Sequence, residues 1–152
     1  MRLSAHFTLS ELTTTSQQLQ NVPGPQQITE LRELAAQVLE PWRAVIGPIR
    51  ITSGYRSVAV NAAVGGSRTS DHVHGRAADC APLAVSLDVA WRALVALAED
   101  LPLDQAILYV RRPGQGWIHV GRRVTPRREL LVQRVGLPTA AWAGYSGPLV
   151  AR

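Results

Sequence analysis

The sequence contains no lysine, and all sixteen of its basic residues are arginine. It has one cysteine, Cys80, which excludes a disulfide within the chain, so the fold does not depend on oxidation. No apolar run approaches the roughly 20 residues that a membrane-spanning helix needs. The opening segment, Met1–His6, lacks the continuous apolar core of a signal peptide. We therefore expect no membrane span, and synthesis in the cytoplasm without a signal peptide.

The composition is that of an ordinary globular domain. The chain has 152 residues, of which 46% are hydrophobic and 18% charged, and this length suits a single domain with one core. The net charge of +5 favours an anionic partner. Much of it comes from the last third, where we interpret six arginines as mostly a solvated face: Arg111, Arg112, Arg122, Arg123, Arg127 and Arg128. Aromatic residues do not alternate regularly with them, so the pattern does not favour nucleic acid as a partner.

The first third of the sequence predicts helices. Thr8–Glu11 has the form of a capping box, in which a hydroxyl residue is followed three positions later by glutamate. From Gln26 to Ile46 the apolar residues recur with the period of an amphipathic helix, and Gly47–Pro48 ends it. Pro41 lies inside this stretch and should kink or split the helix, because proline lacks the backbone donor.

The remainder predicts a small sheet with one more long helix. The strands are expected at 49–52, 77–82, 104–110, 117–121 and 130–135, with a helix capped by Ser86 over 87–101. The predicted fold is α+β: one domain over 1–152, in which N-terminal helices pack on a mostly antiparallel sheet that carries the functional site. The tail from Gly136 is rich in glycine, proline and alanine, so we expect 136–152 to be an arm that wraps the domain or contacts a partner.

Two histidines and one aspartate form the candidate metal site. His72 lies in a polar stretch before Gly75, where a core histidine is not expected, and Asp79 lies within an apolar run, where an unpaired carboxylate is costly to bury. His119 alternates with apolar neighbours in a predicted strand. Two imidazoles and a carboxylate are the protein ligands of an open catalytic zinc site. If Asp79 points into the site, Cys80 points away from it and is a core residue.

The residue types and spacing leave alternatives open. His74 could replace His72 as a ligand, and the spacing favours neither. A histidine in an alternating strand is also more often structural than metal-binding.

A family resemblance adds to this interpretation. The motif Ser70-x-His72-x-x-Gly75-x-Ala77-x-Asp79, followed by Trp117-x-His119-Val120, resembles the M15 peptidases, the zinc D-alanyl-D-alanine carboxypeptidase family of peptidoglycan peptidases. The resemblance is closest to the small branch found in phage endolysins and in phage or prophage structural genes. Further similar segments run in order from residue 6 to about 135, among them His6–Leu12, Ser53–Ser57 and Asp104–Gln105.

The resemblance implies a D-Ala-D-Ala carboxypeptidase/hedgehog-like fold with Zn²⁺ held by His72, Asp79 and His119. It implies that Arg56 grips a substrate carboxylate or carbonyl and that Ser70 helps to hold the peptide. The implied substrate is a peptidoglycan peptide, cut at the bacterial cell wall. Phage structural proteins are the implied partners if the protein is part of a phage particle.

The sequence departs from the family pattern at the general base. Gly116 stands three positions before the last histidine, where some members have an acidic residue, and Tyr109 stands where the small branch usually has glutamate. Tyrosine, with a reference pKa of about 10, is a poor base at neutral pH. Asp71, His74 and Asp104 are the candidate substitutes. The sequence thus supports two functions: a zinc peptidase, or a tail or baseplate module that keeps the peptidase fold with weak or no catalysis.

Overall fold

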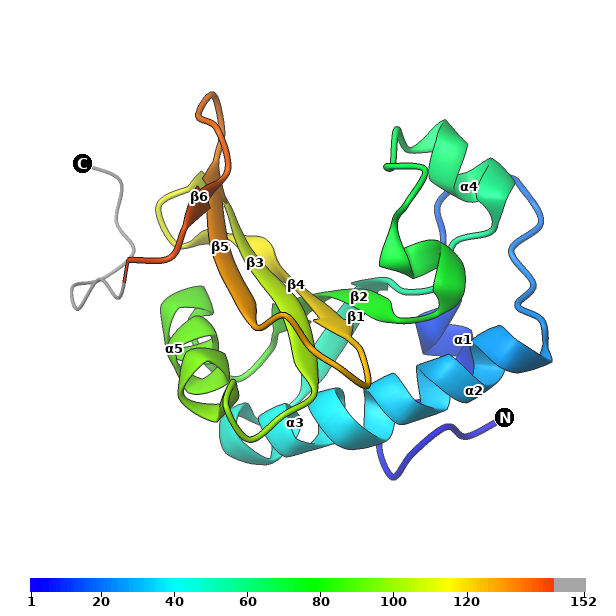
Figure 1. Ribbon diagram of the computed structural model, residues 1–152, viewed down its shortest axis with the longest axis horizontal. Coiled ribbons are helices and arrows are strands. Elements are labelled where there is room, and N and C mark those ends of the chain that lie inside the picture. Colours follow the sequence, from blue (N-terminus) through cyan, green and yellow to red (C-terminus); the bar gives the residue numbers. More distant parts are fainter. Residues whose placement is uncertain (144–152) are drawn as a thin grey trace.

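The structure is a computed structural model that describes residues 1–143. Figure 1 shows the arrangement of its elements. The helical elements are α1 (Leu9–Leu12), α2 (Pro25–Leu34), the π-helix η1 (Ala35–Leu39), α3 (Glu40–Ile46), α4 (Val58–Ala63), the 3₁₀-helix η2 (Asp71–His74) and α5 (Leu87–Leu97). The strands are β1 (Ile49–Ser53), β2 (Ala77–Pro82), β3 (Leu103–Arg112), β4 (Gln115–Arg122), β5 (Glu129–Arg134) and β6 (Ala140–Ala141). Among the helices of residues 1–143, none has both the length and the apolar character needed to cross a bilayer.

The strands form one sheet in the order β1-β2-β4-β3-β5-β6. Every neighbouring pair is antiparallel except β3 with β5, which run parallel. The prediction of an α+β fold with a mostly antiparallel sheet is therefore confirmed. Only part of the predicted arm over 136–152 can be compared with the structure, because 144–152 lie outside the described residues. In the described part, β6 pairs with β5, and the Trp142 ring packs edge-on against Trp91 with centroids 5.5 Å apart.

The long N-terminal helical segment has an irregular turn just before Pro41. Helical structure runs from Pro25 to Ile46 and ends at Gly47, whose φ of 81° is left-handed. The irregularity is a π-turn over Ala35–Leu39, just before Pro41, in which the Glu40 amide donates to the Ala35 carbonyl. Pro41 has no N–H for the normal bond one turn back, and the wider turn on its N-terminal side accommodates this loss without ending the helix.

The sequence predicted the start of two other helices correctly, but it predicted the end of one of them, α5, too late in the chain. The capping box is confirmed: Thr8 accepts from the Glu11 amide, and the Glu11 side chain accepts from the Thr8 amide. Ser86 caps α5 as expected, but α5 ends at Leu97 rather than at Leu101. Residues 98–100 form turns and Leu101 a bend instead, because Pro102 disfavours helical conformation in the residue before it.

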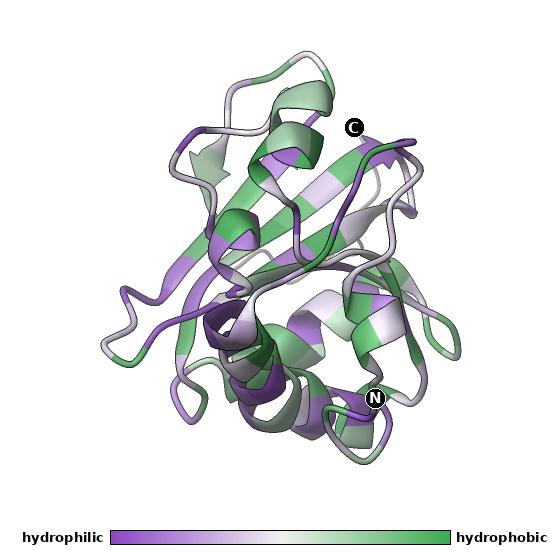
Figure 2. Cartoon of the chain, turned by 90° about the vertical axis from the view of Figure 1, so that its right-hand side faces the viewer, coloured by the Kyte–Doolittle hydropathy of each residue, from purple (hydrophilic) through white to green (hydrophobic). Residues whose placement is uncertain are grey.

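The hydrophobic core lies between one face of the sheet and helices α2, α3 and α5. Its largest fully buried side chains include Trp42, Trp91 and Phe7, and the Trp42 indole donates to the Ala90 carbonyl at 2.9 Å. Figure 2 shows hydrophobic stretches along the strands, with hydrophilic residues on the surrounding turns and loops. Cys80 is fully buried in this core, as predicted from its alternation with Asp79. The opposite face of the sheet is turned toward α4 and the segment that follows it (Figure 1).

The interpretation of the late arginines as a mostly solvated face holds for Arg111, Arg112, Arg127 and Arg128, which are exposed, and is wrong for Arg122. Arg122 is only 7% exposed and pairs with Glu30 and Glu33 of α2, at 3.2 and 3.4 Å. Arg123 and Arg127 both pair with Asp104. Arg122 therefore ties the end of β4 to α2, whereas Arg123 and Arg127 hold Asp104 of β3.

Asp104 is the most deeply buried carboxylate of the described chain. It lies where the register between β3 and β4 shifts, is fully buried, and accepts bonds from the Arg127 amide at 2.9 Å and from its guanidinium at 2.7 Å. Burial alone would raise the pKa of this carboxyl, but the bonds from Arg127 outweigh it and leave the pKa below its usual value. Asp104 is therefore occupied by arginines and is not placed to act as a general base.

This arrangement predicts an acid-sensitive contribution to stability. Because the pKa of Asp104 is lower in the folded chain than in the unfolded one, its contribution is complete above about pH 4 and is lost as the pH falls through the folded value. We expect Asp104→Asn to lower the free energy of unfolding by about 2 kcal/mol at pH 7 and to flatten its decline in acid.

Denaturant unfolding at several pH values measures both effects. The control is Asp88→Asn, which removes a helix-surface pair with Arg92 and is expected to cost about 0.5 kcal/mol or less. Equal pH dependence in wild type and Asp104→Asn would contradict the prediction.

Candidate metal centre

Two of the candidate ligands are placed by strand pairing. β2 and β4 are antiparallel neighbours, and their register sets Asp79 directly opposite His119. Residues opposite each other on adjacent strands project from the same face, so both side chains leave the sheet on the side away from the core. The third, His72, comes from η2, the turn of helix that leads through Gly75 into β2.

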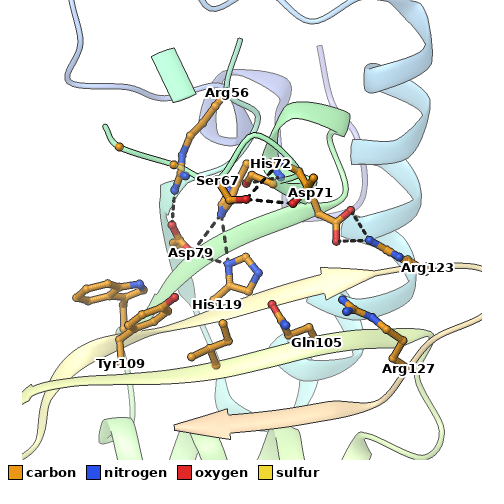
Figure 3. A pocket seen from close by; sticks show the side chains of 16 residues that line it. Arg56, Ser67, Asp71, His72, Asp79, Gln105, Tyr109, His119, Arg123 and Arg127 are labelled. Atoms are coloured by element: carbon orange, nitrogen blue, oxygen red, sulfur yellow. Dashed lines mark hydrogen bonds and ion pairs between the residues drawn. The ribbon is translucent and has the colours of Figure 1, made fainter. Parts of the chain in front are cut away.

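The three side chains converge on one point (Figure 3). His72 Nε2 lies 3.3 Å from His119 Nδ1 and 3.4 Å from Asp79 Oδ1, and the last two atoms are 2.9 Å apart. Zinc bound tetrahedrally at about 2.0–2.2 Å would hold its ligand atoms roughly 3.3–3.6 Å from one another. The three donors are thus spaced close to one face of such a tetrahedron, and together they could hold a metal ion. The residue types also fit a divalent ion of the zinc type.

Neighbouring groups orient these ligands. His72 Nδ1 lies 2.7 Å from the Gly54 carbonyl, which makes Nδ1 the protonated nitrogen and leaves the Nε2 lone pair facing the cluster. The Arg56 guanidinium donates to Asp79 Oδ2 at 2.8 Å, so the other carboxylate oxygen, Oδ1, faces the imidazoles. His74, the alternative left open by the spacing, is exposed and lies outside the cluster.

The ionisation of the cluster suits cation binding. Burial lowers the pKa of His72, against the opposing hydrogen bond with Asp79, so its imidazole is neutral at pH 7. Burial would raise the pKa of the Asp79 carboxyl, but its bonds with His119 and His72 outweigh this and hold the pKa well below its usual value. A neutral imidazole and an ionised carboxylate are the forms that ligate a metal.

Gly75 controls the position of His72. Its φ of 74° is left-handed, and a Cβ there would lie 2.6 Å from the Gln27 backbone carbonyl. Ser70 fixes the other end of η2, because its hydroxyl accepts from the His72 amide at 3.3 Å. Ser70 is therefore a helix cap in the structure as well as a residue that lines the cavity.

We expect Gly75→Ala to be strongly destabilising and to weaken metal binding, because α2 and η2 must separate to admit the methyl group. The matched control is Gly65→Ala, at φ 71° with no atom within 4 Å of the new Cβ. The control carries only the backbone cost of about 1 kcal/mol, and Gly75→Ala should lose roughly 1–3 kcal/mol more. Chemical denaturation and metal titration of both variants test this, and equal losses would refute it.

The cluster opens into a cavity of about 550 Å³. Its lining includes the candidate substrate-binding and base residues Arg56, Ser70, Asp71 and Tyr109, together with Gly65, Gly66 and Trp117. Arg123 and Arg127 line it as well, whereas Asp104 does not. The predicted site residues are thus gathered around one cavity, with the metal cluster in its wall.

The sequence model of the peptidase M15 family matches residues 5–120, which include the three candidate ligands and Tyr109. The chain belongs to the peptidase M15 family. The resemblance drawn from the motifs is confirmed, and membership assigns the chain to the peptidases. A search of curated proteins finds no match to this M15 peptidase.

Tyr109 is held by an aromatic stack that the sequence reasoning missed. In this M15 peptidase Tyr109 pairs with Trp117 across β3 and β4, and their rings stack with centroids 4.6 Å apart and planes 11° from parallel. The Arg111 guanidinium lies 4.9 Å from the Trp117 ring. The sequence could have predicted this stack from the hairpin centred near Pro113–Gly114. Tyr109 and Trp117 are equally far from Pro113, so the two strands place them opposite each other.

The general-base position of this M15 peptidase is unsuited to accept a proton. Burial, and to a lesser extent the charge of Asp79, raises the pKa of the Tyr109 hydroxyl, so it stays protonated at neutral pH. Asp71, the predicted substitute that lines the cavity, has both carboxylate oxygens bonded to Arg123 at 3.2 Å. In Figure 3 Asp71 points toward Arg123 rather than toward the cluster.

Proposed function

We propose that the protein is a zinc-dependent peptidase that acts on peptidoglycan peptides and is encoded by a phage or prophage. The observation that carries the proposal is the spacing of the His72, Asp79 and His119 donor atoms, which fits one tetrahedral ion at the wall of an open cavity. Three protein ligands leave a fourth position for water or substrate, as in catalytic rather than structural zinc sites. When bound there, zinc would polarise the scissile carbonyl and activate the attacking water.

The chain's own residues supply substrate binding in this proposal. Arg56 lines the cavity, and we assign it a substrate carboxylate or carbonyl, since its forked donors suit either group. Its Nε and Nη2 atoms also bond Ser53 and Asp79, at 2.9 and 2.8 Å, which fixes the guanidinium relative to the metal cluster. Ser70, which also lines the cavity, would hold the peptide backbone. The place of action would be the bacterial cell wall, reached after synthesis in the cytoplasm.

A second function is favoured by Tyr109 and Asp71. With a protonated tyrosine at the usual base position and Asp71 bonded to Arg123, the same cavity would bind peptide but cut it slowly. That behaviour fits a tail or baseplate module of a phage particle, with phage structural proteins as partners. The metal ligands are common to both functions, so the two differ in turnover and not in zinc content.

One experiment separates these functions. The purified protein is analysed for bound zinc, and the release of amino groups from peptidoglycan is followed with and without a chelator. Stoichiometric zinc with release that the chelator stops, and that added zinc restores, supports the peptidase. Zinc without release supports the structural module. Absence of zinc binding would refute both proposals.

A further inference from the structure

A second groove of about 550 Å³ lies beside the metal cavity, at the β3–β4 hairpin. Its lining includes Tyr109, Arg111, Arg112, Trp117, Gln133 and Val135. Tyr109 and Trp117 also line the metal cavity, so the two hollows meet at the aromatic stack. A ligand that lies across the metal cluster can therefore continue over the stack into the groove.

The geometry of β3 sets the length of such a ligand. Ile107 pairs with His119 and lines the metal cavity, and Arg111 is four residues further along the same strand. Strand residues advance about 3.4 Å each, so Arg111 lies roughly 13 Å beyond the metal ligands. An extended peptide covers that distance with about four residues.

The charges at this groove are not neutralised by the described part of the chain. Arg122, Arg123 and Arg127 are paired with carboxylates, as described above. Within residues 1–143, Arg111 and Arg112 bond to no carboxylate, and both are exposed. Arg111 is oriented by the Trp117 ring beneath it, which leaves the edge of its guanidinium open to a forked acceptor.

We propose that this groove is a substrate subsite for the carboxylates of an acidic peptide, which lie about four residues from the bond held at the metal cluster. The inference rests on the proposed peptidase function and deepens it by naming the substrate class. Arg111 and Arg112 bind the carboxylates, Gln133 lines the same groove opposite Tyr109, and the Tyr109–Trp117 stack supports the intervening backbone. Charge complementarity favours an anionic ligand, and the planar guanidinium fork fits a carboxylate.

Two end-blocked peptides test this inference with zinc-loaded protein. The first is acetyl-Ala-Ala-Ala-Glu-Glu-amide, and the second has both glutamates replaced by glutamine, so the pair differs only in side-chain charge. Calorimetry at low salt should show the glutamate peptide binding roughly fivefold more tightly, a preference that shrinks at high salt. The double variant Arg111→Gln/Arg112→Gln should lose the preference.

The control variant is Arg32→Gln/Arg50→Gln, which removes the same charge from exposed positions on α2 and β1 and should keep the preference. Both single variants and the melting temperatures are measured as well, so a folding defect is recognised. No preference in the wild type, a preference kept by the groove variant, or an equal loss in the control would overturn the inference. The inference would also be overturned if a polyphosphate chain bound more tightly than the glutamate peptide and only the groove variant lost this binding. That result would assign the groove to phosphate polymers. Because binding is the readout, a protein that prefers glutamate but releases no amino groups refutes the peptidase function and leaves the subsite standing.

Discussion

If the proposed peptidase function holds, changing Tyr109 to glutamate is expected to raise the rate of peptidoglycan cleavage by about 10²–10⁴-fold, the usual contribution of general acid–base help. Tyr109 already lines the metal cavity from β3, so a carboxylate at this position would project from the same face of the sheet as His119. The tyrosine hydroxyl cannot serve as this base at neutral pH, because its pKa is raised above the usual value.

The matched control for this change is Tyr109→Gln, which has the size of glutamate but cannot take a proton. It should remain as slow as the wild type. A gain in both variants would mean that removing the ring opens the cavity, and a wild type as fast as Tyr109→Glu would mean that another group is the base. The rate of the glutamate variant should rise with pH as its carboxyl ionises, which the glutamine variant cannot reproduce.

Changing His119 to alanine is expected to abolish zinc binding and every zinc-dependent activity. His119 supplies one corner of the donor triangle, at 2.9 Å from Asp79 and 3.3 Å from His72. Losing an outer-shell partner of a metal site typically costs about 10–100-fold in affinity, and losing a direct ligand should cost more. Zinc content after dialysis and competition with a metal-sensitive dye measure this.

His74→Ala provides the comparison, because His74 is exposed only two residues from His72 and lies outside the cluster. It should bind zinc as the wild type does. If His74→Ala loses zinc while His119→Ala keeps it, the assignment of ligands is wrong. Circular dichroism of both variants excludes unfolding as the cause.

The fold and two of the three candidate ligands follow from local patterns in the sequence. The alternation of apolar residues around Asp79 and His119 predicts two strands, and a hairpin with His119 on its second strand predicts the face from which it projects. Strand pairing then makes Asp79 and His119 neighbours. The choice between His72 and His74 could not be made this way, because the 3₁₀ turn that holds them has no alternation to separate inward from outward side chains.

The long-range ion pairs could not be predicted from any local pattern in the sequence. Asp71 and Arg123 are 52 residues apart, and Arg122 meets Glu30 across 92. Whether an arginine is solvated or paired depends on which helix the fold brings beside it. The misplaced end of α5 has a local cause instead. The hydrophobic pattern continues through Leu101, but Pro102 disfavours helical conformation in the residue before it.

The three candidate ligands come from two kinds of structure, a sheet and a short helical turn, and this has a mechanical consequence. Asp79 and His119 are bound into adjacent strands by backbone bonds, so bending of the sheet carries both together and preserves their separation. His72 stands on a single short turn outside the sheet, so its distance from the other two can change independently. The ion would thus serve as the crosslink between a stiff element and a compliant one. Removal of the ion should first increase the rate of amide hydrogen exchange over residues 70–76, before exchange in the paired strands increases.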